Sequence, residues 1–600
     1  MKKNTSHFRL RFHFRCLRTV WVIAVLGAVF LATLPASLRA TAYWMNNKIN
    51  DVAPVIGANA FYEAGIYGQN ATAANIEGGN PDLTFESLRH VDSGNLFVPT
   101  GATSTANDHA TWVSQFIAGR PLTGDAANNR TVRTGIASEA TLYAASISKA
   151  PVGTDGTFST TPAIIRSAYT RYFVTTPVDV INSSWGGSMN HNGNYESSQI
   201  TRIVDNLAAR NPHTTMVVAA GNDGGPASGK TSTVSSPANG FNVISVGAMT
   251  ITAGGEYGSI TSFSSRGPVN VFNPNTRAIV GQRAAVHIVA PGDDIVVKIE
   301  GSSVFYGDGT SFAAPIVAGG VALMASASRD LADKDTWSAQ KAEDARDSRV
   351  IRAVLMNSAQ KITGWNNNTT TTTIATSAGT FSPAGTWSNV RVTTQALDYN
   401  LGAGALDLAE TYRQYTGADG GNNWTLDTVS KATDAGAAPF SQTYAFDTSV
   451  SAQDTITLTL SWFAIYSDTY NTTFDDYFTN IGNELEALAN LDLQLWSLTR
   501  EGGEFDQLLA VSMTGVDTVE HLTYTLADGI ADQWLAVVVV HEGMVFDTRT
   551  GAAADSLTTY AMASSHAFGA YAYSAVPEPA TVALLLGGGV LVFVSVRRRR

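Results

Sequence analysis

Short, continuous apolar runs recur through residues 50–415, and helix-like segments lie between them. The candidate strands are Ala73–Ile76, Val178–Asn182, Met216–Ala220, Asn242–Val246 and Val286–Ala290. These runs do not alternate with polar residues, which is typical of parallel strands covered on both faces. Between two of the runs, one apolar helix face is formed by Ile200, Ile203, Val204 and Leu207. Repetition of strand, helix and strand predicts an α/β fold with a doubly wound, mostly parallel sheet.

The pattern changes after about residue 415. Apolar and polar residues alternate with period two in 456–462, 491–495 and 522–526, which is typical of half-buried strands. Only a short stretch near 484–489 has helical spacing. We therefore expect an antiparallel β-sandwich over 420–575, with packing or solubility as its role and binding to matrix or carbohydrate as the alternative. A Thr/Asn run, 366–373, with polar surroundings to about 390, is expected to be a surface insertion in the first domain.

The N-terminus is typical of a secretion signal. A basic start without acids is followed by an apolar run, Thr19–Leu34, and by the small residues Ala40 and Ala42. We expect a signal peptide over 1–42, with an uncleaved membrane anchor as the alternative. The only cysteine, Cys16, lies in this segment, so the mature chain, with its first domain over 43–415, would have no cysteine and no disulfides.

The C-terminus has three parts in order: Val576–Pro579, an apolar stretch at 580–596 and the arginines Arg597–Arg600. An apolar span closed by arginines is a membrane stop. The tail at 576–600 resembles the PEP-CTERM sorting signal of Gram-negative bacteria. The resemblance implies a membrane sorting enzyme of the exosortase type as partner, transient anchoring in the inner membrane, and a final place on the outer surface or in the extracellular matrix. A permanent single-span anchor is the alternative.

Charge narrows the possible partners. The net charge is −12, and the basic residues of the two ends conceal a more acidic body. Such a body repels phosphate backbones, so we expect no nucleic-acid partner. We also expect no cofactor. Acidic clusters such as Asp475–Asp476 leave structural calcium open, but no metal-ligand spacing stands out.

Two residues have the local context of a hydrolytic site. Ser311 follows glycines in Gly307–Pro315 and precedes an all-apolar helical segment, Phe312–Met324. A helix N-terminus favours negative charge there, although a serine in this place is commonly only a helix cap. A serine nucleophile needs a base, and His109 opens a second amphipathic segment.

These segments together resemble the subtilase family of serine peptidases over residues 60–412. The matching motifs, in family order, are His109–Val113, Val180–Gly186, Ala219–Asn222, Ser262–Gly267, Ala290–Gly292, Gly309–Pro315 and the late helix Arg352–Ala359. The family usually has glycine where Ala110 stands. Only the subtilisin order of acid, histidine and serine fits this histidine and this serine.

The resemblance implies a subtilisin-like fold and a serine endopeptidase acting on proteins or peptides. Ser311 would be the nucleophile, His109 the general base and Asn222 the oxyanion donor. The small, uncharged lining implies an apolar P1 residue of medium or large size, with Ser235 near the pocket floor. The implied substrate-binding residues are Ser184, Trp185, Gly186, Ala219, Ala220, Gly221 and Ser235.

The orienting acid departs from the family pattern. Glu77 ends an apolar strand where the family has aspartate, and we prefer it as the acid of the triad. Asp92, in Asp-Ser-Gly, matches the motif better but follows no apolar strand, and Asp82 is a third candidate. The stretch from Ala42 to Glu77 is short, so we expect no prodomain of the usual length. An intact serine, histidine and asparagine favour an active peptidase over a catalytically inactive binding or matrix protein.

Overall fold

The computed structural model describes residues 52–572, apart from 121, 124–130, 133–134, 155, 188–198, 226–231, 277, 301–302, 380–381, 431–440, 468–484, 530 and 550–556. The predicted signal peptide and PEP-CTERM tail, with its membrane segment, lie outside the described residues, as do Asp475 and Asp476.

The first part of the chain forms a parallel sheet with the strand order β12-β8-β7-β6-β1-β5-β2. The bounds are β1 Thr72–Glu77, β2 Leu96–Phe97, β5 Thr141–Ser146, β6 Val180–Ser183, β7 Thr215–Ala219, β8 Ile244–Ile251 and β12 Ile288–Pro291. Neighbours along this order are parallel, and β9 (Tyr257–Ile260) pairs antiparallel with β8. The doubly wound α/β sheet predicted from the apolar runs is confirmed.

Successive strand residues enter two different cores, which explains why the runs are apolar throughout. In β7, Val217 joins the cluster that contains α5 (Asp108–Ala118) and α8 (Thr310–Asp333), whereas Val218 joins the cluster of α6 (Pro162–Thr170) and α7 (Gln199–Arg210). Both faces of the sheet are therefore covered by helices. Among the described residues, α8 alone is long and apolar enough to span a membrane, yet 94% of its apolar window is buried in this core.

The C-terminal part is β-rich. The larger sheet has the order β15-β16-β22-β21-β24-β18-β26, with β20 on β21, and the smaller one the order β17-β25-β19-β23. All pairs are antiparallel except β16 with β22. The main apolar core lies between the sheets, as in a β-sandwich. The bounds are β15 Thr370–Thr376, β16 Gly385–Thr393, β17 Trp424–Ser430, β18 Ser441–Phe446, β19 Thr455–Trp462, β20 Ile465–Tyr466, β21 Leu485–Leu498, β22 Phe505–Ser512, β23 Val519–Thr525, β24 Trp534–Asp547, β25 Leu557–Ser564 and β26 Phe568–Ala570.

Two local expectations were wrong. The stretch near 484–489 is the start of strand β21, where cross-strand pairing with β24 overrides its helical spacing. The polar segment at 366–390 is not an insertion within the first layer, because the hairpin β15–β16 extends the larger sheet of the sandwich through β22. The division of the chain into domains at 415–420 stays a prediction.

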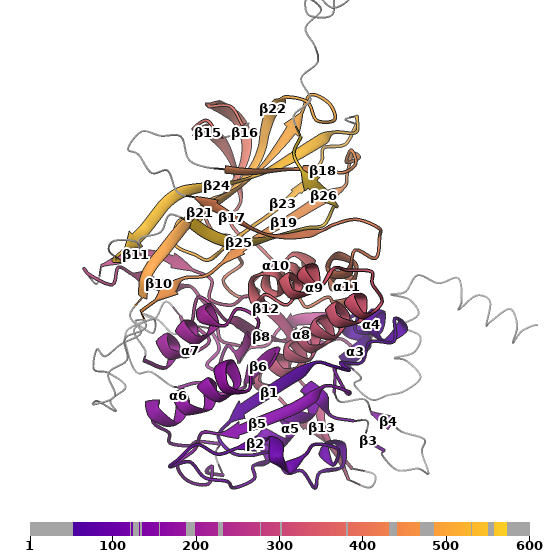
Figure 1. Ribbon diagram of the computed structural model, residues 1–600, viewed down its shortest axis with the longest axis vertical. Coiled ribbons are helices and arrows are strands. Elements are labelled where there is room, and N and C mark those ends of the chain that lie inside the picture. The colour runs from indigo at the N-terminus through magenta and orange to yellow at the C-terminus, as the bar shows by residue number, and fades with distance from the viewer. Residues whose placement is uncertain are drawn as a thin grey trace, which may run out of the picture.

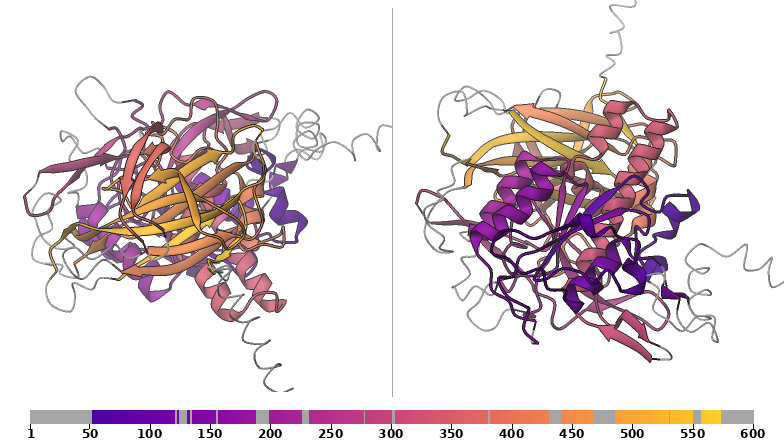
Figure 2. Two further views of the ribbon diagram at one scale, coloured as in Figure 1. Left: turned by 90° about the horizontal axis from the view of Figure 1, so that it is seen from above. Right: turned by 60° about the horizontal axis from the view of Figure 1, so that its bottom comes forward.

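The sandwich lies directly on the α/β layer, with helices α9, α10 and α11 near the junction (Figure 1). Seen from above, its strands cover the α/β layer (Figure 2). Strands β19 and β25 of the smaller sheet contact α10. The other elements are α3 Val52–Val55, α4 Asn59–Glu63, α9 Ala339–Ala345, α10 Ser348–Ser358, α11 Leu408–Thr416, β3 Leu122–Thr123, β4 Thr131–Val132, β10 Val269–Phe272, β11 Ile279–Arg283, β13 Ile295–Glu300, β14 Ser303–Gly307, and short helical turns at Glu86–Leu88, Ser93–Asn95 and Arg171–Thr175.

Candidate active site

Ser311 is the second residue of α8, at the N-terminus of a long and largely buried helix. The N-cap residue of this helix is Gly309, so no side chain caps the helix. The φ angle of Gly309 is +152°, a conformation that favours glycine. The alternative in which Ser311 is only a helix cap is therefore wrong. In the structure the Ser311 hydroxyl donates a hydrogen bond of 3.1 Å to the backbone carbonyl of Ser184.

His109 is held at the N-terminus of α5, on the same face of the sheet as Ser311. The side chain of Asn107 caps this helix by accepting from the backbone N–H of Ala110. The imidazole centroid lies 6.1 Å from the ring of Phe312, the neighbour of Ser311. The packing of α5 against α8 thus brings together two residues that are far apart in sequence.

Glu77 contacts both His109 and the strand next to its own. Its Oε2 lies 3.3 Å from Nδ1 of His109, and its Oε1 accepts a hydrogen bond of 2.7 Å from the backbone N–H of Ser184. The Glu77 side chain is 3% exposed and His109 is 37% exposed. The buried carboxylate therefore holds the imidazole by one nitrogen, and the His109 side chain stays partly exposed.

The pKa of His109 reflects this pairing. Burial opposes protonation, but the hydrogen bond and negative charge of Glu77 outweigh it and raise the pKa of His109 above its usual 6.5.

The other two acid candidates lie in different surroundings. Asp92 is exposed and caps a short helical turn by accepting from the backbone N–H of Gly94. The carboxylate of Asp82 accepts from the backbone and hydroxyl of Thr84. In this part of the chain, the acid beside His109 is Glu77.

Asn222 is oriented by Thr310, the residue before Ser311. Its Oδ1 accepts hydrogen bonds of 2.9 Å from both the backbone N–H and the hydroxyl of Thr310, and that hydroxyl accepts in turn from the backbone N–H of Gly221. The Nδ2 group, the donor end, is thereby turned toward Gly309, where an added Cβ would lie 3.2 Å from it. Sequence reasoning missed this role of Thr310, although its place next to the serine was a usable signal.

Three of the expected substrate-binding residues meet at one point. A Cβ added to Gly186 would lie 2.1 Å from Oγ of Ser235, and one added to Gly221 would lie 3.2 Å from the same atom. Ser235 also donates from its backbone N–H to the carbonyl of Ala220 at 3.0 Å. Glycine at both positions keeps open the space in front of Ser235.

The remaining expected contacts are restricted by burial. Ala219 and Ala220 are 3% and 0% exposed. The Trp185 indole is 8% exposed and packs edge-on against Phe158, so little of this side chain is available to a substrate. In the parts of the chain that the structure describes, no group of three or more His, Cys, Asp or Glu side chains is placed to hold a metal ion.

A family model described as the subtilase family matches residues 78–404, more than half of the chain. The chain belongs to the subtilase family. His109, Asn222 and Ser311 lie within the matched range, and Glu77 lies one residue before it. The family match therefore covers the same part of the chain as the candidate site described above.

Individual relatives match parts of the chain. Subtilisin E of Bacillus subtilis (strain 168) is 29% identical over 299 residues, which cover 49% of this chain and 64% of that relative. The thermophilic serine proteinase of Bacillus sp. (strain AK1) is 38% identical over 122 residues, 20% of this chain and 24% of that protein. The chain thus spans less than two thirds of these relatives. The solved structure of the prenylagaramide maturation protease PagA is 21% identical, with a TM-score of 0.36, covering 51% of this chain and 89% of that one.

The C-terminal tail has a match of its own. Residues 575–600 match the PEP-CTERM protein-sorting motif, so the sorting signal predicted at 576–600 is confirmed as a motif.

Proposed function

We propose that this subtilase is an active serine endopeptidase that hydrolyses proteins or peptides. Ser311 attacks the scissile carbonyl, and His109 takes its proton and passes it to the leaving amine. Glu77 holds the imidazole by Nδ1. Water then cleaves the acyl-enzyme ester, with His109 again as base, and releases the second product.

The observation that carries this proposal is the pairing of buried Glu77 with His109 beside the N-terminus of α8. Before attack, the Ser311 hydroxyl must turn from the Ser184 carbonyl to the imidazole, a change expected where catalytic hydrogen bonds tighten only with substrate bound. Asn222 and the backbone N–H of Ser311 are the oxyanion donors, because Thr310 holds the amide with its donor end toward this region.

The place of action follows from the two chain ends. Residues 1–42 are proposed to direct export, and the PEP-CTERM motif to pass the chain through an exosortase-type sorting enzyme to the outer surface or matrix of a Gram-negative bacterium. The space before Ser235, kept open by two glycines, supports an apolar P1 residue of medium or large size. No cofactor is proposed.

A fluorophosphonate probe tests the proposal, because it reacts only with an activated serine and needs no knowledge of the substrate. The full chain in mild detergent is labelled beside Ser311→Ala. We expect labelling that the substitution abolishes. A folded chain that stays unlabelled would instead support the second candidate, an inactive subtilase-fold protein that binds other molecules.

A further inference from the structure

The segment that carries Ser235 packs against the β-sandwich before the chain enters β8. We call residues 235–243 the P1 segment and residues 462–467 the sandwich corner. Phe241 of the P1 segment is 1% exposed, and Arg283 stacks on its ring at 4.2 Å. The ring lies in a small apolar core that is otherwise built mostly by the sandwich: Val271, Ala464, Tyr466, Leu488, Val516 and Phe546.

A buried carboxylate ties the P1 segment to the sandwich corner. Asp205 of α7 is fully buried and accepts from the backbone N–H groups of Phe241 at 2.7 Å and Asn242 at 3.0 Å. Its third donor is the hydroxyl of Tyr466, at 2.7 Å. A side chain at Gly240 would come within 2.4 Å of the same carboxylate. Because a buried carboxylate is stable only when its oxygens are satisfied, the Tyr466 hydroxyl helps to fix Asp205 and, through it, the P1 segment.

The corner also binds the P1 segment directly. The Asn242 amide donates to the carbonyl of Ala464 at 2.9 Å and accepts from its backbone N–H at 3.0 Å. The Phe241 carbonyl accepts from the Thr518 hydroxyl at 3.0 Å and from Arg352 at 2.9 Å. All of these residues are buried, so a polar group that loses its only partner is left unsatisfied rather than solvated. The Phe241 carbonyl has two donors and loses one of them when the Thr518 hydroxyl is removed.

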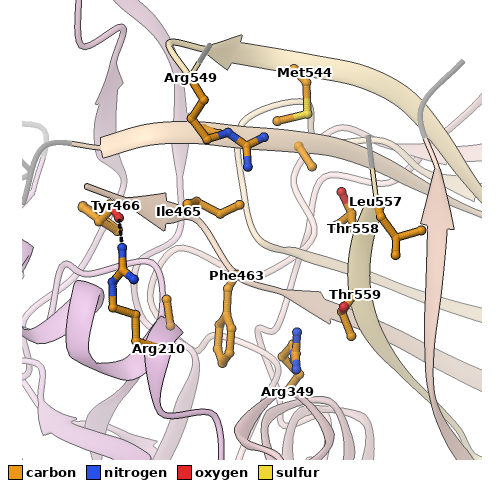
Figure 3. Close-up of a pocket in the computed structure, with 13 residues that line it drawn as sticks. Arg210, Arg349, Phe463, Ile465, Tyr466, Met544, Arg549, Leu557, Thr558 and Thr559 are labelled. Carbon is orange, nitrogen blue, oxygen red and sulfur yellow. Dashed lines mark hydrogen bonds between the residues drawn. The ribbon is translucent and has the colours of Figure 1, made fainter. Parts of the chain in front are cut away.

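Figure 3 shows the other side of the same corner, where Tyr466 and Arg210 of α7 meet. Arg210 donates to the Tyr466 carbonyl at 3.2 Å, and Asn206 donates to the same oxygen at 3.3 Å. The corner borders a cavity of about 290 Å³ between α7 and the sandwich. Two of the arginines that line it, Arg349 and Arg549, are already held by Asp347 and Asp547. The corner is thus fixed to α7 by its backbone as well as by its tyrosine.

We infer that the β-sandwich sets the P1 specificity of the peptidase, with Tyr466 and Thr518 as positioning residues that hold the P1 segment behind Ser235. This inference rests on the proposed function, because P1 selectivity has meaning only for an active peptidase. Neither residue touches a substrate. They act through Asp205 and through the Phe241 carbonyl.

The test is Tyr466→Phe in the full chain, which removes one hydroxyl and keeps the ring. Peptide anilides that differ only in Ala or Phe at P1 give the ratio of two kcat/KM values. We expect this ratio to change by about threefold or more, while the rate of fluorophosphonate labelling at Ser311, which reports the catalytic groups without a P1 side chain, changes less than about twofold.

The matched control is Tyr444→Phe. The Tyr444 hydroxyl likewise donates to a carboxylate, Asp427, at 2.8 Å, but both residues lie inside the sandwich. This variant is expected to keep the wild-type ratio. An unchanged ratio in Tyr466→Phe, or an equal change in both variants, overturns the inference.

A second pair keeps the test decisive if Tyr466→Phe does not fold. Thr518→Val removes the hydroxyl that binds the Phe241 carbonyl, and Thr518→Ser retains it. We expect Thr518→Val to change the ratio of the two kcat/KM values and Thr518→Ser to keep the wild-type ratio. Equal ratios in the two variants contradict the inference. A wild-type chain that is not labelled at all contradicts the proposed function itself, whereas labelling with unaltered ratios contradicts only the role of the sandwich.

Discussion

Glu77 accepts a hydrogen bond of 2.7 Å from the backbone N–H of Ser184. Because its other oxygen faces His109, one carboxylate joins this imidazole to the residue that follows strand β6. The carbonyl of the same Ser184 accepts from Ser311. A glutamate in place of the aspartate usual in this family therefore serves two neighbours, and both Glu77 and Ser311 bind Ser184, the residue that follows β6.

Replacing Glu77 by glutamine is expected to lower kcat on a peptide anilide by about 10³–10⁴-fold, the scale seen when the acid of a triad becomes an amide. An amide nitrogen in place of the Oε2 oxygen cannot accept from Nδ1, and no charge then supports the imidazolium. Asp92→Asn is the control, because that carboxylate only caps an exposed turn. Similar kcat values for Glu77→Gln and wild type would contradict the assignment of the acid.

The pH profile of kcat/KM gives an independent measure of the same pair. The base must be neutral, and Glu77 raises the pKa of His109, so activity should rise with pH through a midpoint above 6.5. In Glu77→Gln the midpoint of the residual activity should lie at a lower pH than in wild type. The reason is that the group that favoured the imidazolium has lost its charge. A midpoint that does not move would show that this pairing does not control the titration.

The same shift predicts a change in stability with pH. The folded-state pKa of His109 is higher than its unfolded value, so protonation favours the folded state. The contribution of the Glu77–His109 pair should be complete below about pH 6.5 and should disappear as the pH rises through the folded-state pKa. Urea unfolding of wild type and Glu77→Gln across this range, with the difference in unfolding free energy as readout, checks the sign.

Thr310→Val is expected to lower kcat by about tenfold with little change in KM, a smaller loss than the 10²–10³-fold expected for Asn222→Ala. Without the hydroxyl, Oδ1 of Asn222 keeps only the backbone N–H of Thr310, and the amide is less well aimed at the oxyanion. Thr310→Ser retains the hydroxyl and should keep most of the activity. Equal kcat values for the Val and Ser variants would remove Thr310 from this role.

Gly186→Ala is expected to reduce hydrolysis after Phe at P1 by about tenfold or more relative to Ala at P1, because the added Cβ meets Ser235. Combining it with Ser235→Gly should recover part of the loss, since the clashing hydroxyl is gone. The kcat/KM values of the two substrates measure the effect. An unaltered ratio would show that the pocket for the P1 side chain does not lie at Ser235.

Local sequence patterns predicted much of the fold. The five apolar runs became β1, β6, β7, β8 and β12, because a strand buried on both faces shows a distinct local signal. β5 was not recognised, since Thr141–Ser146 includes an exposed threonine and a half-buried tyrosine. The hairpin β15–β16 was misplaced because its threonine-rich, largely exposed first strand has no apolar face to indicate a sheet.

The site could be predicted in part. Motifs that resemble those of the subtilase family indicated His109, Asn222 and Ser311, and strand position indicated Glu77. What no pattern could supply were contacts between distant residues, such as the pairing of Tyr466 with Asp205 across 261 positions. Such contacts depend on how two layers pack, and local periodicity contains no information about that.

The path of the chain at the junction has a consequence for how the protein unfolds and for how it can be truncated. The chain leaves the α/β layer to form β15–β16, pairs there with β22, and returns as α11 to pack on α8 before it enters the sandwich again. Each layer is therefore completed by residues that lie within the sequence of the other. A deletion at one end cannot remove the sandwich cleanly, and heating should melt both layers in a single cooperative transition rather than in two steps.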